Sequence, residues 1–167
     1  GEGAGADSPA TAPPSANPGP PRLAVDGLPL MKPPYGTISA IDVNRGAIKW
    51  QIAHGETPDF VRNNPALKGL TIPRTGQATY QIGTLVTKTL VIAGENQVTT
   101  TADHPRGAML RAYDKANGAE VGAVFMNAPQ SGSPMTYAVN GRQFIIVATS
   151  GGTSSGEYIA FALPGKN

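Results

Sequence analysis

The sequence predicts an all-β fold made of small antiparallel sheets that repeat along the chain, and three observations carry this prediction. First, a turn-forming motif occurs twice, each time after an apolar, strand-like run. Second, hydrophobic residues make up 40% of the 167 residues and charged residues 14%, with 21 glycines and 16 prolines. This mixture suits short strands joined by tight turns better than helices. Third, no run of normal helical length has an amphipathic pattern.

The repeated motif spans residues 40–50 and returns, degraded, at residues 112–122. Both copies read Ala-x-Asp with a glycine four residues after the aspartate, and Trp50 ends the first copy where Gly122 ends the second. The aspartate is expected to accept hydrogen bonds from turn amides, the glycine to supply a positive φ, and the indole to lie over a neighbouring sheet. Such a repeat suggests small sheets arranged radially. Its structural positions are Asp42, Gly46, Trp50, Asp114 and Gly118.

The chain divides into a proline-rich beginning and a strand-rich body. Residues 1–34 hold nine of the 16 prolines. We expect a linker or extended arm there, because such a segment buries too little apolar surface to offset its ordering entropy. Residues 35–167 form the body, with a loop insertion at 53–80 that contains a short helical turn near 60–67. A loop of this length is usually functional or a lid.

Strands are expected at regular intervals through the body. Residues 35–52 form a hairpin, 82–93 hold two short strands that break at Thr87-Lys88, and 109–125 form the second motif hairpin. Asn140-Gly141, the strongest short-range hairpin signal, joins strands 135–139 and 143–149, and a last strand covers 158–163. The count is half of a four-stranded unit, one complete unit and three strands of another. Such a set does not close a ring by itself.

Composition and motif context exclude several classes of function. The formal net charge is +2 without a basic run, so nucleic acid is not expected as a partner. There is no cysteine, and His54 and His104 lie in separate loops without a carboxylate cluster, which argues against a zinc site. Residues 152–156 match G-x-S-x-G, but a strand follows and no histidine lies downstream, which argues against a serine nucleophile.

The pattern A-x-D-x-x-x-G-x-x-x-W at residues 40–50 resembles the tryptophan-docking motif of pyrroloquinoline quinone (PQQ)-dependent dehydrogenases. The stretch from Gly132 to Pro164 resembles the C-terminal end of the membrane-type quinoprotein glucose and polyol dehydrogenases of that family. The similarity runs from about Leu28 to Pro164. It implies a partial eight-bladed β-propeller of about two to three blades, in which each tryptophan stacks on the next blade.

The resemblance implies oxidation of a sugar, polyol or alcohol by hydride transfer to PQQ. In the family a calcium or related cation polarises the PQQ carbonyl, an aspartate acts as general base, and electrons pass to a quinone or cytochrome. It also implies a bacterial periplasmic location, with membrane association through a missing N-terminal part. No residue of this chain matches the family's catalytic aspartate, metal ligands or lysine. The isolated chain is therefore expected to be inactive and to need the remaining blades, from the same enzyme or a complementary chain.

The resemblance places the cofactor pocket at the loop Ser150–Glu157, whose glycines allow close backbone approach to a flat ligand. The expected cofactor-binding residues are Asp103, Gly151, Gly152, Thr153 and Ser154. Thr153 stands where the family carries a histidine tied to substrate preference, which weakens the case for glucose. Asp103 has two readings, a residue near the quinone or a solvated turn aspartate. Arg106 either pairs with a PQQ carboxylate or faces water, and we favour water.

A non-enzymatic propeller scaffold for protein binding, of the outer-membrane assembly type, is the alternative. The 53–80 insertion also keeps two readings, because Asp59, Arg62 and Lys68 either rim an active-site mouth or belong to a plain surface loop. The Gly132–Pro164 stretch favours the dehydrogenase over the scaffold.

Overall fold

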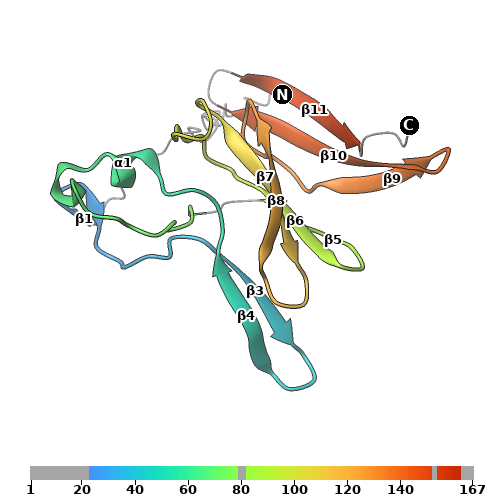
Figure 1. The fold of residues 1–167 in the computed structure, drawn as a ribbon, viewed down its shortest axis with the longest axis horizontal. Helices are drawn as coiled ribbons and strands as arrows, with labels where there is room; N and C mark the ends of the chain where they lie inside the picture. The colour runs from blue at the N-terminus through green and yellow to red at the C-terminus, as the bar shows by residue number, and fades with distance from the viewer. Residues whose placement is uncertain (1–22, 79–81, 152–153, 163–167) are drawn as a thin grey trace, which may run out of the picture.

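The computed structural model describes residues 23–78, 82–151 and 154–162, and these residues form an all-β chain with two short helical turns (Figure 1). The all-β prediction is confirmed. The strands are β1 (Ala24–Val25), β2 (Leu28–Pro29), β3 (Thr37–Asp42), β4 (Ala47–Ala53), β5 (Leu85–Val86), β6 (Leu90–Gly94), β7 (Ala108–Asp114), β8 (Glu120–Met126), β9 (Met135–Val139), β10 (Arg142–Gly151) and β11 (Ser154–Ala162). The helical turns are α1 (Asp59–Arg62) and the 3-10 turn η1 (Pro65–Leu67). No helix in the described part of the chain is long and apolar enough to cross a membrane.

The strands form four antiparallel sheets. The largest has the order β5-β6-β7-β8, a meander in which each strand pairs with its sequence neighbour. Along the chain, the two-stranded sheets β1-β2 and β3-β4 come before this four-stranded sheet, and the three-stranded sheet β9-β10-β11 comes after it. One complete four-stranded unit, half a unit before it and three strands after it agree with the strand count expected from the sequence.

The two motif hairpins, β3-β4 and β7-β8, share the same pairing, including a shift of register at the equivalent position. Ala40 pairs with Trp50 in the first and Ala112 with Gly122 in the second, and in both the register shifts at the next pair. Such a bulge increases the local twist of a hairpin. The motif therefore specifies the bulge as well as the turn.

The turn chemistry of the motif is visible in both copies. Asp42 Oδ1 accepts hydrogen bonds from the amides of Asn44 (3.0 Å) and Arg45 (3.2 Å), and Asp114 Oδ1 accepts one from the Ala116 amide. The motif glycines have φ of 62° at Gly46 and 78° at Gly118, a conformation that a residue with a Cβ adopts only with strain.

The main core lies between the four-stranded and the three-stranded sheet. Ile92, Ala108 and Leu110 from the first sheet pack with Val147 from the second, and partly buried Ile145 and Phe161 close the cluster. On β11 the core side chains Ile159 and Phe161 alternate with exposed ones, because successive residues of a strand point to opposite faces.

One predicted loop is a strand for most of its length. Residues 150–157 were expected to join two strands, but β10 continues to Gly151 and β11 starts at Ser154. Thr149 pairs with Glu157 and Gly151 with Ser154, so the ladder of backbone hydrogen bonds continues almost to the tip. Small, flexible residues indicated a loop, but neighbouring-strand pairing outweighed that local preference.

Candidate functional site

The segments that follow β4, β6 and β8 gather with the end of β10 along one side of the sheets, which we call the loop edge (Figure 1). It comprises residues 54–78, 95–107 and 127–131, and the end of β10. In an antiparallel meander every second strand ends at the same side, so the topology brings these segments together. The two motif turns, at residues 43–46 and 115–118, lie at the other ends of their hairpins.

Hydrogen bonds join the segments of the loop edge across the sheets. Gln97 Nε2 donates to the carbonyl of Ala78 (2.8 Å), and the Gln130 amide donates to the carbonyl of Glu95 (2.8 Å). The Ser150 amide donates to the carbonyl of Pro129 (3.0 Å). The loop edge is therefore one connected surface.

Buried polar side chains concentrate at the loop edge, although water surrounds most loops. A buried polar group costs free energy unless it is hydrogen-bonded. Several of these side chains are hydrogen-bonded, whereas both amide atoms of Gln77, the Thr99 hydroxyl and His104 Nε2 are buried without a partner in the described part of the chain. The buried polar residues of this edge are His54, Thr57, Asn64, Thr75, Gln77, Glu95, Gln97, Thr99, His104 and Gln130.

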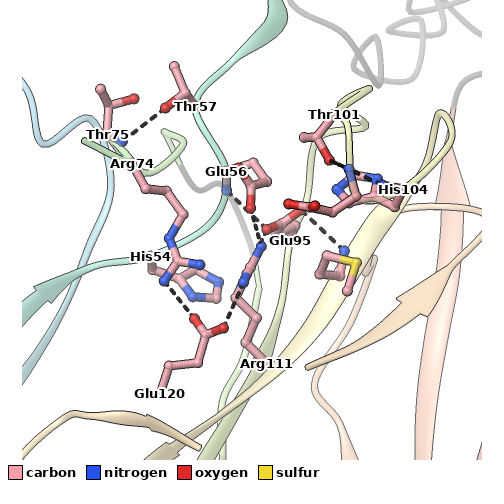
Figure 2. Close-up of polar contacts among 12 residues, drawn as sticks. His54, Glu56, Thr57, Arg74, Thr75, Glu95, Thr101, His104, Arg111 and Glu120 are labelled. Atoms are coloured by element: carbon pink, nitrogen blue, oxygen red, sulfur yellow. Dashed lines mark hydrogen bonds and ion pairs between the residues drawn. The ribbon is translucent and has the colours of Figure 1, made fainter. Parts of the chain in front are cut away.

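Arg111 of β7 is the centre of this polar region, and its guanidinium contacts three carboxylates (Figure 2). Its Nε donates to Glu95 Oε1 (2.8 Å), its Nη2 to Glu56 Oε1 (2.7 Å) and its Nη1 to Glu120 Oε1 (2.9 Å). The Arg111 side chain is 5% exposed and that of Glu95 is fully buried. All three branches of the planar guanidinium are thus used, a geometry that lysine does not reproduce.

The charges of this cluster shift one another's proton affinity. Burial opposes the positive charge of Arg111, but the carboxylates of Glu95, Glu120 and Glu56 outweigh it and raise its pKa. Burial acts to raise the pKa of Glu56, yet Arg111 and Arg62 overcome it and hold that pKa below the ordinary value. Glu95 lies deeper, so burial dominates and raises its pKa despite Arg111.

His54 is held in its neutral form beside this cluster. Its Nε2 lies 3.1 Å from the carbonyl of Gly94, which can only accept, so Nε2 carries the proton. Nδ1 then accepts from the Tyr113 hydroxyl (2.9 Å). Burial lowers the pKa of His54 and raises that of Tyr113. This arrangement positions the loop edge and leaves no free ring nitrogen for proton transfer.

Gln130 joins the four-stranded sheet to the segment that leads into the three-stranded sheet. Its Oε1 accepts from the Gly94 amide (2.6 Å), and its Nε2 donates to the carbonyls of Gly83 (2.9 Å) and Gly132 (2.6 Å). One buried side chain thus satisfies three backbone groups.

The Trp50 side chain extends from the β3-β4 hairpin to the turn of the second motif hairpin, β7-β8. Its Nε1 donates to the carbonyl of Lys115 (3.0 Å), and a Cβ added to Gly118 would meet Trp50 Cε3 at 2.8 Å. The indole therefore lies directly on the second motif glycine, where only glycine leaves room.

The structure describes three of the five residues expected to bind a cofactor. Gly151 and Ser154 face each other as a pair at the tip of β10-β11, whereas Asp103 lies exposed on the 95–107 segment, where its amide donates to Thr101 Oγ1. Gly152 and Thr153 fall outside the described residues. Arg106 is 55% exposed and lies 3.5 Å from Asp59, so it faces water and a carboxylate.

Sequence reasoning missed Arg111, Glu95 and Gln130. The signal that could have identified Arg111 is its position as the one charged residue within the apolar run 109–113, in a sequence where charged residues are scarce. Within the described ranges no group of three histidine or acidic side chains is arranged to hold a metal ion.

Comparison with known proteins identifies similar sequences over most of the chain. The family model described as "PQQ: Glucose/ethanol/alcohol dehydrogenase, beta-propeller domain" matches residues 3–145. Quinoprotein glucose dehydrogenase of Escherichia coli (strain K12) is 32% identical over 152 residues, which cover 86% of this chain and 17% of that protein.

Two further relatives have similar coverage. The probable quinate dehydrogenase (quinone) of Xanthomonas campestris pv. juglandis is 35% identical over 150 residues, covering 85% of this chain and 17% of that protein. Quinoprotein glucose dehydrogenase A of Acinetobacter calcoaceticus is 28% identical over 146 residues, which cover 83% of this chain and 16% of that protein. The chain thus spans about a sixth of the length of the curated relatives it matches.

Proposed function

Because this chain belongs to the family of PQQ-dependent glucose, ethanol and alcohol dehydrogenase β-propellers, we propose that it forms C-terminal blades of such an enzyme. The enzyme oxidises a sugar, polyol or alcohol, and these blades supply one wall of the cofactor pocket. PQQ, when bound, accepts a hydride from the carbinol carbon of the substrate. The observation that carries the proposal is the loop edge, where segments from three sheets form one hydrogen-bonded polar surface.

The residues of the loop edge fit one side of a PQQ site. Arg62 and Arg74 already pair with Glu56 and Glu120, whereas Arg106 is 55% exposed and is the cation at this surface suited to reach a carboxylate of PQQ. Gly151 and Ser154 at the β10-β11 tip offer backbone and a hydroxyl to a flat ligand. The cation of the family does not fit the described residues, which lack a cluster of ligands. We therefore assign its ligands and the general base to other blades.

The incomplete sheets support the need for further blades. Ile41 and Ile48 of the β3-β4 pair are 62% and 61% exposed, and Met135 and Val139 of β9 are about half exposed. Such apolar residues on sheets with open edges are a site of association. The rest of the propeller, from the same chain or a complementary one, is the proposed partner.

Relatives named for glucose and for quinate define the substrates to test, both of them polyhydroxylated rings. The proposed setting is the bacterial periplasm, with a quinone or cytochrome as acceptor. The test adds PQQ and calcium to the assembled protein, follows the absorbance of bound PQQ, and measures dye reduction with glucose and with quinate. PQQ binding with reduction by either substrate is expected. An assembled protein that binds no PQQ would refute the proposal and favour a protein-binding scaffold.

A further inference from the structure

Segment 54–78, which follows β4, is tied to the blade by a chain of ion pairs that begins and ends in the segment itself. Figure 2 shows the part of this chain that runs from Glu56 through Arg111 and Glu120 to Arg74. Arg62 Nη2 lies 3.0 Å from Glu56 Oε2, and Glu56 Oε1 lies 2.7 Å from Arg111 Nη2 on β7. Arg111 Nη1 lies 2.9 Å from Glu120 Oε1 on β8, and Glu120 Oε2 lies 2.6 Å from Arg74 Nη2. Each of these two carboxylates thus joins two arginines, one of them Arg111.

The centre of this chain is shielded from water, which strengthens its ion pairs. The Arg111 side chain is 5% exposed and Glu56 is 18% exposed. Glu95, fully buried, accepts from both Arg111 Nε and the Glu56 amide (3.0 Å), so it binds the strand and the segment at once. Low local dielectric makes such a network rigid when all of its groups are paired.

The two ends of the segment are joined to each other. The Gln77 amide donates to the carbonyl of His54 (2.9 Å), and the Thr75 amide donates to Thr57 Oγ1 (3.1 Å). A segment closed at its base in this way does not swing open without breaking those bonds.

The glycines that would serve as hinges for a lid are packed. Gly55 and Gly76 lie at the two ends of the segment with φ of 86° and 71°. A Cβ on Gly76 would meet the carbonyl oxygen of His54 at 2.8 Å, and one on Gly55 would meet Gln77 Cγ at 3.1 Å. The backbone at each end of the segment thus packs closely against the other end, and a hinge motion there would have to break this packing.

We propose that segment 54–78 is a fixed wall that positions the substrate, clamped to the blade by Arg111 through Glu56 and Glu120, and not a lid that closes over it. This inference rests on the proposed function, because segment 54–78 belongs to the same loop edge as Gly151, which pairs with Ser154. Glu56, Arg74 and Arg111 are positioning residues. They act through the segment and touch no reacting atom.

The test compares Glu56→Gln and Arg74→Gln in the assembled, PQQ-loaded enzyme. Arg45→Gln is the matched control, because Arg45 also pairs with a carboxylate but is 84% exposed at a motif turn. In both test variants amide hydrogen exchange across residues 54–78 should accelerate about tenfold, because local opening becomes easier. KM for the substrate should rise about tenfold with kcat within about twofold, the signature of lost binding alignment. The control should change neither quantity.

Three results would overturn the inference. Unchanged exchange in both variants means that the ion pairs do not clamp the segment. Faster exchange with unchanged KM means that the segment is fixed but positions no substrate. A lower kcat at unchanged KM means that the segment acts on the chemical step. If the wild-type protein binds no PQQ, the positioning role fails together with the proposed function, while hydrogen exchange still decides the clamp separately.

Discussion

Replacing Gly118 with alanine should destabilise the protein by about 2–5 kcal/mol, of which about 1–3 kcal/mol should come from packing against Trp50 and Ile52. Two effects add at this position. A residue with a Cβ at the φ of 78° costs about 1–2 kcal/mol. The new methyl group would also meet Trp50 Cε3 at 2.8 Å and Ile52 Cγ2 at 3.1 Å, and such overpacking costs about 1–3 kcal/mol.

Gly46 provides a matched control within the same chain. It occupies the same motif position with a φ of 62°, but a Cβ there would have nothing within 4 Å. Gly46→Ala should therefore cost only the backbone strain of about 1–2 kcal/mol. The difference between the two variants isolates the contacts with Trp50 and Ile52 from the backbone strain.

The assay is equilibrium urea unfolding followed by far-ultraviolet circular dichroism, with fluorescence as a second probe, since Trp50 is the only tryptophan of the chain. In a Trp50→Ala background, the excess cost of Gly118→Ala over Gly46→Ala should shrink, because the two closest contacts, both with the indole, are removed and only the contact with Ile52 Cγ2 remains. Such non-additivity is expected of residues in contact. Equal losses for Gly118→Ala and Gly46→Ala, or additive effects in the double variant, would refute the reasoning.

Three further predictions concern other parts of the fold. Burial lowers the pKa of His54, so as the pH falls below about 6.5 the unfolded state takes up a proton that the folded state does not, and stability falls. Comparison of wild type with His54→Gln from pH 7.5 to 5.5 isolates this loss. The raised pKa of Glu95, which favours the folded state at low pH and loses that contribution as pH rises, is common to both proteins. An identical pH profile for both would contradict the assignment. Gln130→Leu should cost at least about 1–3 kcal/mol in urea unfolding, because the buried Gly94 amide loses its partner and the part-buried carbonyls of Gly83 and Gly132 lose theirs as well. Exposed Gln143→Leu is the control and should stay within about 0.5 kcal/mol. Asn140, with φ of 50°, should tolerate glycine but lose about 1–2 kcal/mol as valine, and equal stabilities would show that the turn imposes no left-handed residue there.

Much of the fold was predictable because it depends on neighbours in the sequence. The Asp-to-Gly spacing around Asp42 and Asp114 predicts both motif turns, and Asn140-Gly141 predicts the hairpin that both residues form with positive φ. The short helical turn near 60–67 is confirmed as α1 and η1. In each case the residues that specify the structure lie within one turn of one another.

The loop edge was predictable only in outline. Sequence reasoning identified segment 53–80 as an insertion and the 150–157 stretch as a candidate pocket, and the pocket assignment remains a proposal. It did not identify Arg111, because its carboxylate partners Glu56 and Glu95 lie 55 and 16 residues away in sequence. The extension of β11 to Ser154 was missed for a similar reason, since pairing with β10 decided it.

The sequence by itself determined the strands, the turns and the family of this protein, because hydrophobic alternation, glycine positions and a repeated motif act over a few residues. Only the tertiary structure decided which charges meet. Arg111 meets Glu56 and Glu95 because the fold brings the segments after β4 and β6 together, and it meets Glu120 because β8 pairs with β7. Burial leaves each of these charges in need of a partner. Ion-pair partners across a fold follow from topology and desolvation, and neither leaves a local pattern in the sequence.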